Sequence, residues 1–253
     1  MRRTTLFLIA TVFSAGCVRV EAQAAAPAKW ADTISSEIDQ AQLAGDAARL
    51  EAAVAMASRV ATAYPSDGLI LHYQGYAVYR KAILTMAAGG NAFALFEESQ
   101  SILEHSLKTR PLAETHMLLS SIAGQLIAKN PSRAMELGMA SGASTSAAMA
   151  IGPTNPRVWL LRGQGAIFTP KEYGGGLSAA EEDLKRAIEL FGKDAPKPGE
   201  PSWGKAEAHA WLGQVYEKQG NKAKAADSYK TALDLAPTYS YARMLAAALK
   251  SGN

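Results

Sequence analysis

The sequence predicts an all-α protein built as a solenoid of helical hairpins. Its 253 residues are 48% hydrophobic and 19% charged, and alanine is the dominant apolar residue. The sequence has no long stretches in which Val, Ile or Thr alternate with polar residues, so its composition favours helices over strands. Small residues and prolines also return at similar distances along the chain, which is typical of helical repeats.

The first 24 residues are predicted to be a secretory signal peptide. The basic start "MRR" precedes the apolar run "LFLIATVFSAGCV", which is too short for a comfortable membrane span. The small-residue site Ala22-Gln23-Ala24 fits cleavage after Ala24. The alternative is a lipoprotein signal ending in "SAGC" with Cys17 as the lipidated residue, although Ser14 stands where an apolar branched residue is usual. We therefore expect an exported, periplasmic protein, or a membrane-anchored lipoprotein, with residues 25–29 as an N-terminal linker.

Cleavage would remove Cys17, which is the only cysteine of the chain. A mature chain without cysteine can form no disulfide, thiol nucleophile or cysteine metal site. Removal of three arginines and one glutamate would also change the net charge from +3 to +1. Such a near-neutral chain lacks the basic footprint of a nucleic-acid-binding protein, so we expect no nucleic-acid partner. No transmembrane span is expected once the signal peptide is removed.

Five helical hairpins are predicted within a single repeat domain over residues 30–250. Prolines, glycines and asparagines at helix ends mark their boundaries. The Pro-rich stretch "DAPKPGEPSW" (194–203) is expected to be a long loop between the fourth and fifth hairpins. The predicted hairpins cover residues 30–64, 66–110, 112–152, 154–193 and 203–236, and a last helix over 238–250 would cap the stack.

The clearest unit covers residues 206–239, "AEAHAWLGQVYEKQGNKAKAADSYKTALDLAPTY". Small residues on two antiparallel helices would let the helices approach closely, and two tyrosines would fill the space around them. Gly75 and Gly163 take the corresponding small-residue place in earlier hairpins. The predicted structural positions of the unit are Leu212, Gly213, Tyr216, Ala225, Tyr229, Ala232 and Pro237.

These residues fall at the spacing of a tetratricopeptide repeat, and the chain resembles the exported bacterial members of that family. The stretch "NPRVWLLRGQGAIFTPKEYGGGLSAAEEDLKRAIELF" is similar to an element of such proteins, in which an Asn-Pro-Arg helix start precedes Thr-Pro and a glycine turn. The resemblance implies a right-handed superhelix of five helix pairs with a C-terminal capping helix. It also implies a scaffold for binding and names no activity.

The resemblance further implies which side chains of the first helices point into a concave groove. Such a lining is aromatic and apolar at its centre, and suits a peptide with apolar anchors or a small apolar ligand. In the alternative interpretation the superhelix is tight, and the same residues are simply core. The implied groove residues are His72, Tyr76, Tyr79, Arg80, Leu118, Gln125, Arg157, Leu160, Gln164, Phe168 and Gln214.

The glycine run 174–176 is interpreted as part of a five-residue insertion within one hairpin. A phosphate loop would need a lysine directly after its last glycine, and Leu177 stands there instead. Ser178 and Glu181 match a capping box, and Tyr173 is expected to fold back on the helix pair. The four histidines are isolated in the sequence, so no metal site and no cofactor are expected.

The sequence thus favours a protein that is not an enzyme. We expect a periplasmic or secreted scaffold that binds a protein or peptide through its concave groove. The alternative is a lipoprotein that binds a small ligand as an accessory component of an envelope transport system.

Overall fold

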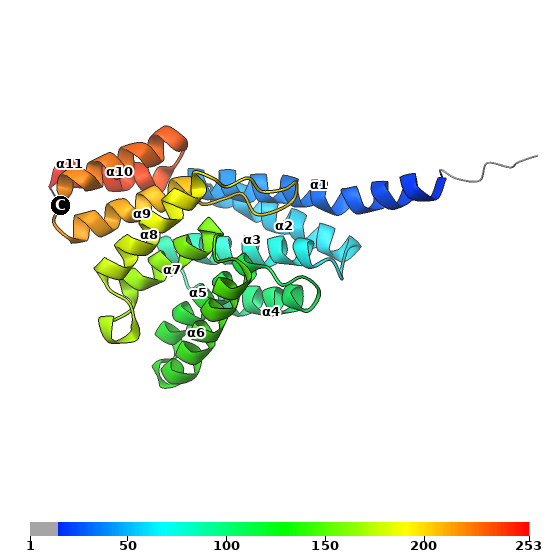
Figure 1. Ribbon diagram of the computed structural model, residues 1–253, viewed down its shortest axis with the longest axis horizontal. Coiled ribbons are helices and arrows are strands. Elements are labelled where there is room, and N and C mark those ends of the chain that lie inside the picture. The colour runs from blue at the N-terminus through cyan, green and yellow to red at the C-terminus, as the bar shows by residue number, and fades with distance from the viewer. Residues whose placement is uncertain (1–14, 253) are drawn as a thin grey trace, which may run out of the picture.

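The computed structural model describes residues 15–252, and side chains from residue 27 onward, as an array of helices joined by short connections (Figure 1). Within these residues there is no strand. The α-helices are α1 (Ala15–Ala44), α2 (Ala47–Ala63), α3 (Gly68–Ala87), α4 (Phe93–Thr109), α5 (Ala113–Lys129), α6 (Ala134–Ile151), α7 (Pro156–Phe168), α8 (Leu177–Phe191), α9 (Lys205–Lys218), α10 (Lys222–Leu235) and α11 (Ser240–Ser251), and the short 3₁₀ helices are η1 (Pro131–Arg133) and η2 (Lys171–Tyr173).

Consecutive helices pack as five hairpins, α1–α2 to α9–α10, and α11 packs on α10 as a cap. The predicted all-α hairpin solenoid is thereby confirmed. Most of the predicted signal peptide lies in residues 1–14, outside the described residues. Helix α1 begins at Ala15 and continues without a break through residues 25–29, so the predicted linker is helical in the structure.

Polar side chains fix several helix starts. Asp46 accepts a hydrogen bond from the Arg49 amide at the start of α2, and Asp67 accepts bonds from two amides at the start of α3. Asn155 and Asn221 do the same for α7 and α10. These side chains satisfy amides that have no partner inside the helix. The boundaries therefore follow from local chemistry that the sequence displays.

Glycines allow the two helices of a hairpin to touch. A Cβ added to Gly75 would lie 2.6 Å from the Leu103 side chain, and one added to Gly163 would lie 2.8 Å from Leu184 Cγ. At Gly213 the added carbon would overlap the Tyr229 ring. Leu212, Tyr216, Ala225, Tyr229 and Ala232 are buried as well, and Pro237 follows the end of α10.

The third hairpin departs from the regular packing. Helix α6 packs along α5 and barely touches α7, which packs against α5 instead. In Figure 1, α6 extends away from the C-terminal helices. Met135 and Met139 on α6 are 80% and 66% exposed. The repeat is therefore interrupted between the third and fourth hairpins.

The C-terminal cap returns to the first hairpin. Leu43 of α1 packs with the cluster that contains Tyr239, and a Cβ added to Gly45 would lie 2.8 Å from Ser240 Oγ. Helix α11 therefore contacts the C-terminal end of α1, so the two ends of the described chain meet.

The segment "TPKEYGGGLS" (169–178), which contains the predicted five-residue insertion, forms a tight turn. Gly174 and Gly176 have φ angles of 81° and 96°, which favour glycine. A Cβ on Gly175 would collide with the Thr169 carbonyl oxygen, so no larger residue fits there. The amide of Gly176 donates to the carbonyl of Ala166 at 2.8 Å, which satisfies one of the last carbonyls of α7.

Two details of this turn were predicted wrongly. Ser178 does not cap α8, because the helix already begins at Leu177 with Gly176 as its N-cap. Glu181 instead pairs with Lys185 and accepts a bond from Gln219 on the adjacent α9. Tyr173 is 78% exposed and does not fold back on the helix pair.

Candidate functional site

Side chains from α3 and α7 converge on Trp203, the last residue but one before α9. The Tyr76 ring stacks on Trp203 with a centroid separation of 5.0 Å. The guanidinium carbons of Arg80 and Arg157 lie 5.5 Å and 6.0 Å from the Trp203 ring. His72 stacks on the other side of Tyr76 at 6.1 Å. These five residues form the central cluster.

Arg80 joins three helices within this cluster. Its Nη2 lies 2.5 Å from Glu207 Oε1 on α9, and its Nε donates to the Tyr76 hydroxyl at 2.9 Å. The Tyr76 hydroxyl in turn donates to Asp39 on α1 at 3.4 Å. Arg80 and Glu207 are both buried, so each depends on the other for compensation of its charge.

Burial shifts the pKa of Asp39, beside the central cluster, and of His72, within it, in opposite directions. Burial raises the pKa of Asp39 to about 7, with Arg80 opposing the shift and Glu207 adding to it. Burial lowers the pKa of His72 to about 3, so its imidazole is neutral at pH 7. His72 Nδ1 lies 2.8 Å from Thr115 Oγ1 on α5, which holds the ring in place.

Arg157 forms the other edge of the cluster. It is 2% exposed, and its Nη2 lies 2.6 Å from Asp194 Oδ2. Its guanidinium carbon also lies 5.5 Å from the Phe191 ring centroid. Arg157 therefore links the start of α7 to the segment that follows α8.

Residues 194–203, here termed the plug, pack on α1 and α3 through three buried residues. The Gly199 amide donates to Asp32 Oδ1 on α1 at 2.6 Å, and the Tyr73 hydroxyl donates to the Gly199 carbonyl at 3.0 Å. Gly199, Pro201 and Trp203 are buried, whereas the intervening Ser202 is exposed. In Figure 1 the connection between α8 and α9 runs out along α1 and returns.

The predicted groove residues were expected either to line an open groove or to be core, and their burial distinguishes the two. Residues from α3, α5 and α7 are brought together as the register implied, but they are core and offer no open groove surface. The buried residues are His72, Tyr76, Tyr79, Arg80, Leu118, Arg157 and Leu160.

The other predicted groove residues remain accessible. Phe168, at the end of α7, is 71% exposed, and Gln125, Gln164 and Gln214 are partly buried. The Phe168 ring contacts Trp211 of α9 edge to face at 6.4 Å.

Trp211 contacts Tyr241 of α11 at 6.1 Å, and both rings are partly buried. Phe168, Trp211 and Tyr241 form a row across three first helices, here termed the aromatic strip. Sequence reasoning missed Trp211 and Tyr241 because they lie outside the implied groove register. Aromatic residues on the first helices of successive units were the available signal.

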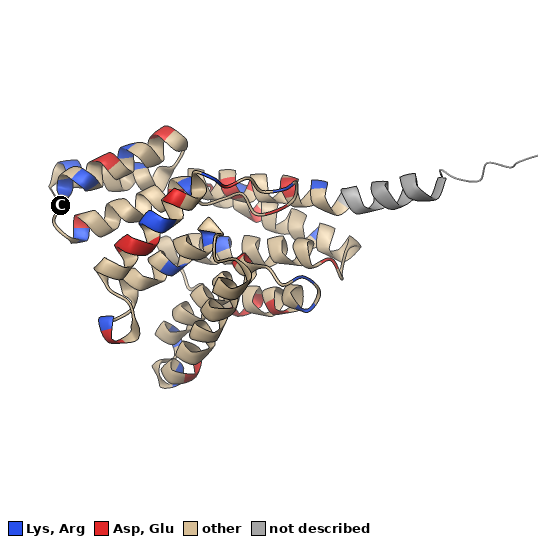
Figure 2. Ribbon diagram, viewed as in Figure 1, with Lys and Arg blue, Asp and Glu red and all other residues tan. Residues whose placement is uncertain are grey.

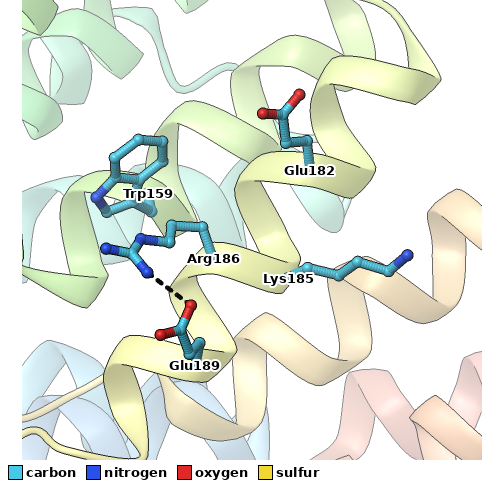
Figure 3. Close-up of a pocket in the computed structure, with 5 residues that line it drawn as sticks. All are labelled: Trp159, Glu182, Lys185, Arg186 and Glu189. Carbon is cyan, nitrogen blue, oxygen red and sulfur yellow. Dashed lines mark hydrogen bonds and ion pairs between the residues drawn. The ribbon is translucent and has the colours of Figure 1, made fainter.

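Two further hollows lie on the outer face. The first lies between α7 and α8, lined by Trp159 and charged residues of α8, where Arg186 pairs with Glu189 at 2.6 Å (Figure 3). The second lies between α3 and α4 and includes Gln74 and His105. Both are shallow surface depressions, and neither gathers groups in an arrangement suited to catalysis.

Charged side chains of both signs are distributed over the described part of the chain. Lysine and arginine are interspersed with acidic residues over the helices of Figure 2. Among the described residues, no three His, Cys, Asp or Glu side chains come together as metal ligands. No helix in this part of the chain is both long and apolar enough to cross a membrane.

Comparison with known proteins supports the fold. Residues 206–239, the unit identified in the sequence, match the tetratricopeptide repeat family. The structure is similar to the HusA haemophore from Porphyromonas gingivalis, with a TM-score of 0.60 and 24% identity over 75% of this chain and 94% of that one. It is also similar to a thermophilic tetratricopeptide repeat protein of Thermus thermophilus, with a TM-score of 0.57 and 20% identity over 81% of this chain and 92% of that one. No curated protein matches the sequence. At these identities the similarity shows a tetratricopeptide-like solenoid and does not show a function.

Proposed function

We propose that the protein is a non-catalytic scaffold that binds a protein partner at the aromatic strip. The exposure of Phe168, next to Trp211 and Tyr241, carries this proposal. Aromatic side chains dominate the energetics of protein interfaces, and an exposed ring that adjoins two partly exposed rings offers contiguous apolar surface to a partner. The tetratricopeptide-like solenoid is a fold that presents extended surfaces to partners.

Polar groups beside the strip add specificity. Gln214 lies three residues after Trp211 on α9 and is partly accessible. Its side-chain amide offers both a donor and an acceptor to a partner backbone. Gln164 lies one turn before Phe168 on α7 and is also partly accessible. The strip therefore suits a peptide segment that combines an apolar anchor with free backbone carbonyls.

The proposed place of action is the periplasm. The basic start, the apolar run and the site before Ala24 support export. Lipidation at Cys17 is the alternative, and Cys17→Ser separates the two. That substitution should release a lipoprotein from membranes and leave the distribution of a cleaved protein unchanged.

Site-specific crosslinking tests the scaffold function. A photoreactive amino acid at position 168 should crosslink to a defined protein in the native envelope fraction. The same group at Tyr173, which is 78% exposed but outside the strip, is the matched control and should not crosslink to that protein. Equal crosslinking at both positions, or none at 168, would refute the strip as the binding site. A small molecule retained in native mass spectrometry and lost on Phe168→Ala would instead support the small-ligand alternative.

A further inference from the structure

The connection that holds the plug is longer than the array needs. Residues 192–204 join α8 to α9, whereas three or four residues join each of the other successive hairpins. Helices α8 and α9 nevertheless pack directly on each other. The connection could therefore leave its seat without separating the two helices that it joins.

The seat recognises the plug as a binding site recognises an extended peptide. Both backbone groups of Gly199 are held by side chains of other helices, through Asp32 at 2.6 Å and Tyr73 at 3.0 Å. One end of the plug is anchored by the carboxylate of Asp194 on Arg157, and the other by the indole of Trp203. An anchored carboxylate, a clamped backbone and an inserted aromatic ring are separate elements of peptide recognition.

The plug leaves polar atoms of its seat without partners. Arg157 Nε and His72 Nε2 in the seat are buried and make no hydrogen bond with any described residue, and the same holds for Trp203 Nε1 in the plug itself. Asp194 reaches only the two terminal nitrogens of Arg157, Nη2 at 2.6 Å and Nη1 at 3.4 Å. Unpaired buried polar atoms cost free energy, so a ligand that also engages Arg157 Nε would bind this seat better than the plug does.

We propose that the plug is a releasable intramolecular ligand and that its seat is a second binding site. The partner is a protein segment of the same chemistry: extended, containing proline, with an aromatic anchor in the place of Trp203 and a carboxylate for Arg157. This site is distinct from the aromatic strip and does not depend on it.

Covalent attachment makes the plug a strong competitor. A ligand tethered through a short linker acts at an effective concentration of the order of millimolar. A partner in solution can bind only those molecules whose seat is empty. Its apparent affinity is therefore its intrinsic affinity multiplied by the fraction of such molecules. A partner therefore displaces the plug only if it binds the seat tightly or is present at high local concentration.

A peptide added in trans tests the proposal. The synthetic peptide KDAPKPGEPSWG, which copies residues 193–204, is titrated by calorimetry into the wild-type chain and into Trp203→Ala. We expect binding to the variant to be at least about tenfold tighter than to the wild type. Ser202→Ala alters the exposed neighbour and should behave as the wild type. The same peptide with alanine in place of its tryptophan should not bind.

A second variant covers the case in which Trp203→Ala does not fold. Gly199→Ala combined with Asp194→Asn weakens the two other anchors. A Cβ at Gly199 would lie 3.0 Å from Ala28 Cα on a backbone with φ of 82°. Asp194→Asn removes the charge that pairs with Arg157. Hydrogen exchange then reports whether the plug is released in a folded chain. Persistent protection of the plug in every folded variant would identify it as permanent core and overturn the proposal. Release without peptide binding would overturn it equally. Phe168→Ala should leave peptide binding unchanged, which separates this test from that of the aromatic strip.

Discussion

The central cluster and the aromatic strip share helix α7 and differ in what covers them. Arg157 and Phe168 both lie on α7, yet Arg157 is 2% exposed and Phe168 is 71% exposed. The plug covers the first and does not reach the second. The comparison shows that a loop between two hairpins, and not only the packing of the helices, contributes to the difference in exposure along α7. We accordingly expect the central cluster to carry stability while the plug is seated, and the aromatic strip to bind the partner of the scaffold in either state of the plug.

The largest effect is expected when the central ion pair is broken. Arg80→Ala leaves the Glu207 carboxylate buried without its partner, which should cost about 3–5 kcal/mol of unfolding free energy. The matched control is Arg133→Ala, because Arg133 and Glu136 form an exposed, solvent-screened pair whose loss should have far less effect. Urea denaturation measures both. Equal losses in the two variants would mean that the central cluster does not carry the stability assigned to it.

The next effect contrasts two glycines of α7. Gly163→Ala should destabilise the chain by about 1–3 kcal/mol, because the new methyl group meets Leu184. Gly165→Ala should stabilise it by about 0.4–1 kcal/mol, because nothing lies within 4 Å and alanine favours the helix. Thermal unfolding of the two variants should therefore shift in opposite directions. A shift of the same sign would contradict the close contact between α7 and α8.

A smaller effect should appear as a pH dependence of the central cluster. The pKa of Asp39 is raised to about 7, so its contribution to stability is present below about pH 4 and is lost as pH rises through about 7. The pKa of His72 is lowered to about 3, so its contribution is present above about pH 6.5 and is lost as pH falls through about 3. The two contributions oppose each other between about pH 4 and 6.5.

Single variants should reveal these opposing contributions. In Asp39→Asn, the unfolding free energy should rise with pH between about 4 and 6.5, by at most about 1.4 kcal/mol per pH unit. In His72→Gln it should fall with pH over the same interval. Denaturant titrations at several pH values measure both slopes. Identical slopes in the two variants would show that neither pKa is shifted as assigned.

The smallest effect on stability is expected at the aromatic strip. Phe168→Ala removes a ring that is 71% exposed, and should change the unfolding free energy by less than about 0.5 kcal/mol. The same variant should lose the crosslinked partner. A large loss of stability would place Phe168 in the core and remove the basis for the strip as a binding surface.

Much of the fold could be predicted because its signals are local. Asp46, Asp67 and Asn155 stand directly before the helices that they cap, and Gly163 and Gly213 mark the close contacts of their hairpins. Tyr76 and Arg80 also meet, as residues four apart on one helix do. These features depend on spacings within one helical unit, which a sequence shows directly.

The plug could not be predicted because its contacts are distant in sequence. Its Gly199 is held by Asp32 and Tyr73, more than 120 residues away, and the Pro-rich composition suggested only a loop. A weaker signal was present. Gly199, Pro201 and Trp203 alternate with exposed or partly exposed residues, which is typical of an extended segment with one buried side. The weak packing between α6 and α7 was also not predictable, because it depends on how the third and fourth hairpins cross.

Hydroxyl-radical footprinting of the purified chain tests the contrast between the two regions most directly. The labelling of each aromatic residue is measured by mass spectrometry in a single experiment. We predict strong labelling of Phe168 and Tyr173 and protection of Tyr76 and Trp203. Labelling of Trp203 to the extent seen at Tyr173 would show that the plug does not cover the central cluster, and would contradict the account.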